Sequence, residues 1–195
     1  MNKLPEKIKG LLIVALIIAA TSANAQFKFG VGGGVNMSNM GGSDISGTDR
    51  MLGFNGGFMM EVKLPIKLGF EADVLFSTKG TKGLLFKDEN GNSIGTTDLK
   101  FSYIDMPVVI KIYMAKVLSF QLGAQYSVLL NSNSLGVYSD EKWKNSDLSA
   151  VVGFGLDVLK LHVSARYNYG LTSIDAAGAD VKSNMVTLTL GVWLK

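Results

Sequence analysis

The sequence predicts an all-β fold, an eight-stranded antiparallel up-and-down transmembrane β-barrel, from two features. Apolar and polar residues alternate with a period of two through nearly all of residues 26–195, which is typical of strands whose two faces meet different surroundings. The connections between these strands alternate between long polar segments and short turns, which is the layout of barrels that span a bacterial outer membrane.

Residues 1–25 have the features of a cleaved signal peptide. The segment begins with three lysines, Lys3, Lys7 and Lys9. An apolar run follows at residues 10–20, and TSANA offers an Ala-x-Ala cleavage site before Gln26. A membrane-anchoring helix is the alternative, but it needs roughly twenty apolar residues, about twice the length of this run. We therefore expect a signal peptide at 1–25 and one outer-membrane barrel domain at 26–195.

The composition narrows the classes of function. The chain has 19 Lys and Arg residues against 16 Asp and Glu residues, and loss of the signal peptide would leave 16 against 15. Such a balanced chain gives no reason to expect nucleic acid as a partner. The absence of cysteine excludes disulfides and thiolate metal sites. We expect neither a metal ion nor another cofactor.

Eight strands are expected from the alternating segments. Their ranges are 27–36, 51–63, 68–79, 99–113, 117–130, 147–158, 161–170 and 184–194. The long polar connections are 37–50, 80–98, 131–146 and 171–183, and the short ones are 64–67, 114–116 and 159–160. With both chain ends in the periplasm, the long connections lie outside the cell. Asn90-Gly91, within one long connection, is typical of a hairpin turn.

The segment FSYIDMPVVIKIYM, residues 101–114, shows the two faces of one strand. One face carries Ile104, Met106, Val108, Ile110 and Ile112. The other includes Asp105 and Lys111. A soluble barrel would turn the apolar face inward, so alternation alone leaves the orientation open. In the other strands many glycines share the polar face, where small residues relieve crowding inside a narrow barrel. We therefore expect the apolar face to meet lipid, and Asp105 and Lys111 to face the interior.

Pro107 interrupts the same segment and lacks a backbone N–H. A closed barrel has no edge strand in which that loss is harmless, so we expect a bulge or a local break in pairing. A bulge would shift the phase of the residues on one side of Pro107 relative to those on the other.

An interior cluster of charged residues is expected from the phase of the strands. Its members are Glu71, Asp73, Asp105, Lys111 and Arg166. Eight strands enclose a bore that side chains only just fill, so we interpret the cluster as a plug of ion pairs and hydrogen bonds. A conducting path is the alternative. Arg166 is the only arginine expected inside, and its strand lies roughly opposite those of the three carboxylates, so we expect it to pair with one or more of them.

Three stretches resemble the outer-membrane β-barrel domain family that includes the PorT-type proteins of Bacteroidota. They are LGFEADVLFSTKG (68–80), FSYIDMPVVIKI (101–112) and ARYNYGLTSID (165–175). The middle stretch is the most specific, with its tyrosine, acidic residue, proline and aliphatic run. The resemblance covers essentially all of 26–195 and implies a β-barrel in the cell outer membrane. One departure is the C-terminus, GVWLK, where such barrels commonly finish on an aromatic residue.

These features favour a non-enzymatic integral outer-membrane protein of a Gram-negative bacterium, with external loops that contact the envelope or a partner. The expected partners are membrane lipid and lipopolysaccharide, with a protein or glycan as the further class that the loops would bind. A narrow porin-like channel for small solutes is the first alternative.

A lipid-modifying outer-membrane enzyme is the second alternative. It rests on His162 and Ser164, which lie two residues apart, as in a pair that outer-membrane lipid A deacylases use. By phase both face inward near a periplasmic turn, away from the outer leaflet. We therefore expect an interior hydrogen-bonded pair and no catalytic residues.

Overall fold

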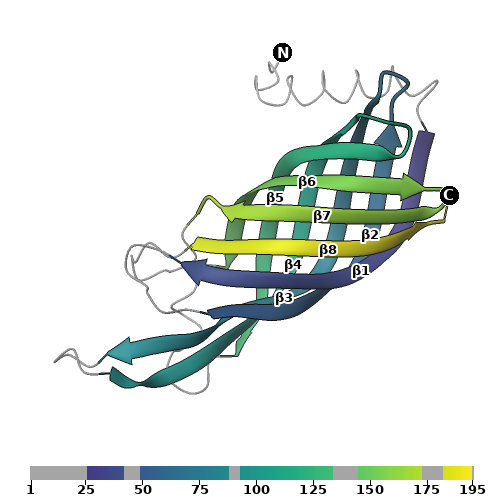
Figure 1. Ribbon diagram of the computed structural model, residues 1–195. Coiled ribbons are helices and arrows are strands. Elements are labelled where there is room, and N and C mark those ends of the chain that lie inside the picture. Colours follow the sequence, from purple (N-terminus) through teal and green to yellow (C-terminus); the bar gives the residue numbers. More distant parts are fainter. Residues whose placement is uncertain (1–25, 42–48, 88–92, 134–144, 173–181, 195) are drawn as a thin grey trace, which may run out of the picture.

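The computed structural model describes residues 26–41, 49–87, 93–133, 145–172 and 182–194 as one closed barrel of eight antiparallel strands (Figure 1). The strands are β1 (Gln26–Gly41), β2 (Asp49–Lys63), β3 (Leu68–Lys87), β4 (Ser93–Tyr113), β5 (Leu118–Asn133), β6 (Ser146–Val158), β7 (Leu161–Gly170) and β8 (Lys182–Trp193). The predicted fold class is confirmed. The expected signal peptide and the expected turn at Asn90-Gly91 lie outside the described residues.

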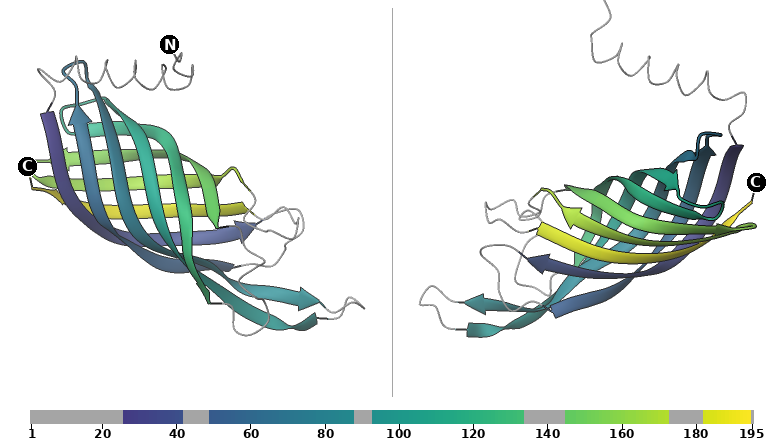
Figure 2. Two further views of the ribbon diagram at one scale, coloured as in Figure 1. Left: turned by 180° about the vertical axis from the view of Figure 1, so that it is seen from behind. Right: turned by 45° about the horizontal axis from the view of Figure 1, so that its top comes forward.

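Each strand pairs with its neighbours in sequence, and β1 pairs with β8 to close the ring. Closure satisfies the backbone groups that would otherwise lie at an open sheet edge. The start of β1, the end of β8 and the three short connections lie at one end of the barrel, and the long connections leave from the other (Figures 1 and 2). Among the described residues, no helix is long and apolar enough to cross a membrane.

Strands β3 and β4 are longer than the sequence predicts. We expected a polar loop at 80–98, but β3 continues to Lys87 and β4 begins at Ser93. The added residues pair with each other, from Leu84 with Thr97 to Lys87 with Ser93, and they project beyond the barrel (Figure 1). Glycines and lysines in this segment suggest a loop, whereas cross-strand pairing stabilises a hairpin that no single strand reveals.

The apolar face of each strand forms the outer surface, as predicted. Val108 and Leu122 are 57% and 53% exposed on that surface, whereas Asp105 and Lys111 are 2% and 0% exposed in the interior. The strands β6, β7 and β8 alternate between buried and exposed residues along almost their whole length. An apolar exterior around a polar interior is the arrangement of a transmembrane barrel.

Pro107 is buried, and it breaks the pairing locally without a bulge. The β3–β4 ladder passes from Ala72–Val108 to Leu75–Asp105 in the same register, without a pair at Pro107. On the other side Pro107 pairs with Gln125 of β5 in regular register. Of the two expectations, the local break is therefore right and the bulge is wrong. Asp105 and Lys111 keep the same inward phase.

Candidate functional site: an interior ion-pair network

Strand register brings together the charged residues in the half of the barrel that carries the short turns. Glu61 on β2 lies directly opposite Glu71 on β3, a like-charge pair that needs a cation to be stable. Lys111 on β4 is opposite Gly69 of β3, whose missing side chain leaves it space. On the far wall, Arg166 of β7 is opposite another glycine, Gly153 of β6.

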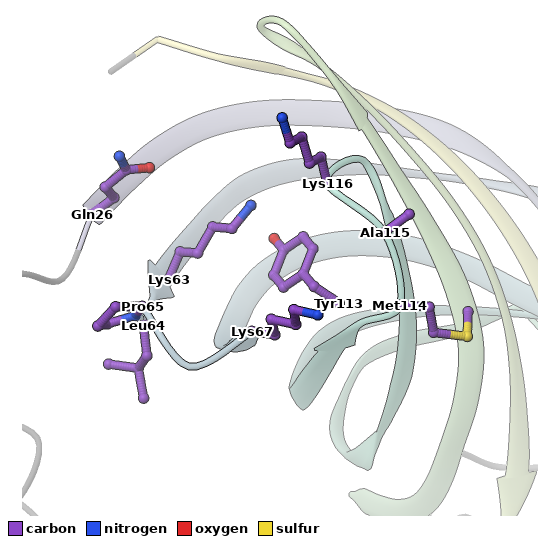
Figure 3. Close-up of a pocket in the computed structure, with 9 residues that line it drawn as sticks. All are labelled: Gln26, Lys63, Leu64, Pro65, Lys67, Tyr113, Met114, Ala115 and Lys116. Atoms are coloured by element: carbon purple, nitrogen blue, oxygen red, sulfur yellow. The ribbon is translucent and has the colours of Figure 1, made fainter.

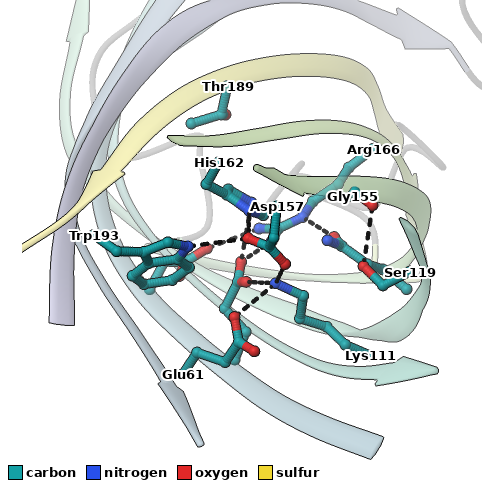
Figure 4. Close-up of polar contacts among 12 residues, drawn as sticks. Glu61, Lys111, Ser119, Gly155, Asp157, His162, Arg166, Thr189 and Trp193 are labelled. Atoms are coloured by element: carbon teal, nitrogen blue, oxygen red, sulfur yellow. Dashed lines mark hydrogen bonds and ion pairs between the residues drawn. The ribbon is translucent and has the colours of Figure 1, made fainter. Parts of the chain in front are cut away.

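Lys111 is the centre of this network (Figure 4). Its Nζ donates to Glu61 Oε2 at 2.8 Å, to Glu71 Oε2 at 2.8 Å and to Asp157 Oδ2 at 3.1 Å. All three donor positions of the ammonium group are thereby used. The lysine is completely buried, and such a charge is tolerated only when it is paired in this way.

Arg166 is the second cation and crosses the bore from β7. Its Nη1 donates to Asp73 Oδ2 at 2.7 Å, and its Nε donates to Gln121 Oε1 at 2.6 Å. Its Nη2 donates to Glu71 Oε1. Glu71 therefore accepts from both cations, one through each oxygen, and links Lys111 to Arg166.

Asp157 on β6 extends the network toward the end of the barrel that carries the short turns. Its Oδ1 accepts from Trp193 Nε1 at 3.0 Å and lies 2.8 Å from His162 Nδ1. The hydroxyl of Tyr113 lies 3.1 Å from Asp157 Oδ2 and also contacts Glu61 Oε1. The aromatic rings of His162 and Trp193 pack together with centroids 5.4 Å apart. These contacts join five strands of the barrel, β2, β4, β6, β7 and β8.

Four of the five predicted cluster residues, Glu71, Asp73, Lys111 and Arg166, belong to this network, and Asp105 does not. Asp105 Oδ1 instead accepts from Lys79 Nζ at 2.7 Å. The same ammonium donates to Ser127 Oγ at 3.0 Å and lies 4.7 Å from the centre of the Tyr103 ring. The structure thus divides the expected cluster into two, and Asp105 is not a partner of Arg166.

Several members of the network are absent from the predicted cluster. They are Glu61, Tyr113, Asp157 and Trp193, and Lys79, the partner of Asp105 in the second cluster, is absent from the prediction as well. Lys79 lies between two buried residues, Thr78 and Gly80, so alternation does not reveal it. The period-two phase contains the signal for the other four, since each is next to an exposed apolar residue. Trp193, for example, lies between Val192 and Leu194, which are both exposed.

The arrangement holds opposite walls of the barrel together and offers little to a reacting substrate. His162 and Ser164 are 1% and 2% exposed and face the interior. The hydrogen-bonding partner of His162 is Asp157, and no hydrogen bond joins it to Ser164. Among the described residues, no group of His, Asp and Glu side chains is arranged to hold a metal ion.

Comparison with known proteins supports the same architecture. The family described as outer membrane protein beta-barrel domain matches residues 20–176. No curated protein matches the sequence.

Among solved structures, the chain is similar to the attachment invasion locus protein Ail of Yersinia pestis, in complex with the heparin analogue sucrose octasulfate. The identity is 17%, covering 87% of this chain and 99% of that one, with a TM-score of 0.54. It is also similar to Neisserial surface protein A, at 16% identity over 84% and 96% of the two chains, with a TM-score of 0.56. A third is OprG from Pseudomonas aeruginosa, at 11% identity over 88% and 97%, with a TM-score of 0.50. At these identities the likeness is one of fold. The family match and the barrel architecture place the protein in the outer membrane.

Proposed function

Since the chain belongs to the outer membrane protein beta-barrel domain family, we propose that it acts as a non-conducting, non-enzymatic outer-membrane barrel whose external segments contact the envelope or a partner. The observation that carries this proposal is the hairpin of β3 and β4, which projects from the end opposite the short turns (Figure 1). A closed interior explains why the contacts are external.

The hairpin exceeds what membrane crossing requires. A transmembrane strand needs about 9–11 residues, and β7 has 10, whereas β3 has 20 and β4 has 21. The described pairing of β3 with β2 reaches Lys82, and that of β4 with β5 begins at Lys100. Beyond these points, within the described part of the chain, the outer edges of the hairpin have no strand partner. Open edges present N–H and C=O groups that another chain or a glycan can bind.

The proposed partners follow from the two outer surfaces of the molecule. The apolar belt contacts membrane lipid, and the rim from which the hairpin projects lies at the level of lipopolysaccharide. The hairpin would contact a protein or glycan outside the cell. The Ail structure contains the heparin analogue sucrose octasulfate, which is a sulfated polyanion. The near-balanced charge of this chain gives no reason to favour a partner of that kind. We further propose that residues 1–25 are removed as a signal peptide and that the chain is of the PorT type found in Bacteroidota.

The charge network argues against a channel for small solutes. Lys111 and Glu71 are 0% and 1% exposed, and Arg166 crosses the bore at the same level. A solute would have to separate buried ion pairs, which is strongly unfavourable when partners are lost. Purified protein in planar bilayers is expected to give no sustained current, and stable, salt-dependent current steps would contradict the proposal.

A lipid-modifying activity is disfavoured because His162 and Ser164 are enclosed. Mass spectrometry of lipid A from a deletion strain tests this, and we expect the masses to be unchanged.

The hairpin itself is tested by trimming it. Replacing residues 83–97 with an Asn-Gly turn joins the strands just beyond Thr81, which pairs with Leu99. Detergent sensitivity of a deletion strain is expected to be corrected by the wild-type chain and not by the trimmed one. Heat-dependent gel mobility of outer-membrane fractions must show equal amounts of both folded barrels. If the trimmed chain fully corrects the detergent sensitivity, the hairpin is not required for the proposed function.

A further inference from the structure

A pocket of about 660 Å³ opens at the periplasmic end of the barrel (Figure 3). Its walls are the two short connections after β2 and β4, and its floor includes Tyr113. Both walls are held in place by backbone hydrogen bonds. Tyr113 N donates to Lys67 O at 2.8 Å, and Met114 N donates to Leu118 O at 3.0 Å. The volume lies within the range of small-molecule sites.

The lining of this pocket is basic. Lys63, Lys67 and Lys116 line it, and no acidic residue does. Figure 3 draws the three lysines around Tyr113, and Lys63 Nζ stands 3.7 Å from the centre of that ring. Among the described residues, none of these three ammonium groups has a carboxylate within ion-pair distance.

The interior carboxylate Glu61 forms its direct contacts with other residues. Glu61 accepts from Lys111 at 2.8 Å, contacts the Tyr113 hydroxyl and lies 3.7 Å from Lys28 Nζ. Both of its oxygens are therefore already engaged. Lys63 is half-buried, and Lys67 and Lys116 are exposed, so the pocket presents three positive charges that no carboxylate in its lining balances. Such a concentration of one sign of charge in a cleft attracts anions.

We propose that this pocket is a binding site for a phosphate group presented from the periplasm. A phosphate group carries one full charge as a diester and about −1.5 to −2 charges as a monoester, and its oxygens can accept from the ammonium groups that line the pocket. Lysine binds phosphate as a point charge without the fixed fork of arginine, so the site is selective for charge more than for shape. The Gln26 side chain, which also lines the pocket, adds a neutral donor. Because this site lies at the opposite end from the hairpin, it is independent of the external contacts proposed above.

Two sources can supply such a group, a soluble phosphate compound or the head group of a phospholipid in the inner leaflet. The probe is pyrophosphate, titrated calorimetrically into the full chain folded in maltoside micelles, which contain no phosphate. We expect saturable binding that weakens as salt is raised. Changing both turn lysines, K67Q with K116Q, is expected to weaken binding about tenfold.

The matched control is K160Q. Lys160 is an exposed lysine of the remaining short turn and does not line the pocket, so its change is expected to leave the affinity unaltered. Nanodiscs containing phosphatidylglycerol separate the sources. If the lipid is the source, phosphorus NMR will detect head groups held by the wild type but not by K67Q/K116Q. If a soluble compound is the source, pyrophosphate will bind in these nanodiscs with unchanged affinity. Absence of binding in micelles, or equal weakening by K160Q, would overturn the proposal.

Discussion

Arg166 Nη1 lies 2.7 Å from Asp73 Oδ2, so that a side chain of β7 is hydrogen-bonded to β3 across the bore. In a ring of eight strands taken in order, β3 and β7 are four places apart and therefore face each other. The same guanidinium contacts Glu71 of β3 and Gln121 of β5. One side chain thus joins three strands, and its removal leaves two buried carboxylates with fewer donors.

We predict that Arg166→Met lowers the free energy of unfolding by about 3–5 kcal/mol, because the carboxylates of Asp73 and Glu71 would stay buried without this cation. Adding Asp73→Asn is expected to recover part of the loss, since the remaining group is neutral. The measurement is a double-mutant cycle in reversible urea unfolding from lipid vesicles.

Asp105→Asn is the control for that cycle, because Asp105 is paired with Lys79 and has no contact with Arg166. Its effect is expected to add to that of Arg166→Met within about 0.5 kcal/mol. A coupling as large as that of Asp73 would mean that the interior forms one cluster rather than two.

Lys79 provides a second and separate prediction. Its ammonium is 3% exposed and donates to Asp105 and Ser127, so Lys79→Met is expected to destabilise the barrel by about 3–5 kcal/mol. Combining it with Asp105→Asn is expected to restore stability in part, and Asp73→Asn is expected to give no such recovery. Urea midpoints of the three variants at constant lipid composition measure this. Recovery by Asp73→Asn instead would contradict the pairing.

The orientation of the strands predicts how charge is tolerated on the outer surface. Leu122 is 53% exposed and is the fifth residue of β5, whereas Leu118 is the first residue of that strand and lies beside the short turn. Leu122→Arg is expected to reduce stability by about 2–4 kcal/mol, and Leu118→Arg by about 0–1 kcal/mol, because the penalty falls toward the interface. Equal effects of the two substitutions in a folding titration would argue against this placement in the bilayer.

The period of two is enough to assign the faces of the strands, because a slip of one residue would turn every apolar side chain inward. It therefore predicts that Asp105 and Lys111 share the interior. Partners are harder to predict, because they depend on the register of several strands at once. Lys79 illustrates this difficulty. It lies at the last residue of the expected strand 68–79, where an interior position is not evident, yet β3 continues well beyond it.

The hairpin of β3 and β4 was not predicted for a related reason. Its strands are stabilised by each other, and local composition with Gly83 and Gly95 is typical of a loop. Trp193 lies in the C-terminal segment GVWLK, and only the fold reveals that its indole donates to Asp157. Long-range contacts of this kind have no signature within either segment.

Two neighbouring glycines of β2 give the last prediction. Gly57 faces the interior, where a Cβ would collide with the carbonyl oxygen of Val74 and lie 3.0 Å from Leu75 Cα. Gly56 faces outward, and a Cβ there would come no closer than 3.6 Å to the carbonyl oxygen of Gly32, an ordinary contact. Both are strand residues, so the intrinsic effect of replacing glycine with alanine is similar at the two positions. Gly57→Ala is expected to destabilise the barrel by about 1–3 kcal/mol because backbone must move, whereas Gly56→Ala is expected to be neutral or stabilising by about 0.4–1 kcal/mol. Urea unfolding of the two variants in the same vesicles measures the difference, and a neutral Gly57→Ala would show that the interior has room for a methyl group where β2 meets β3.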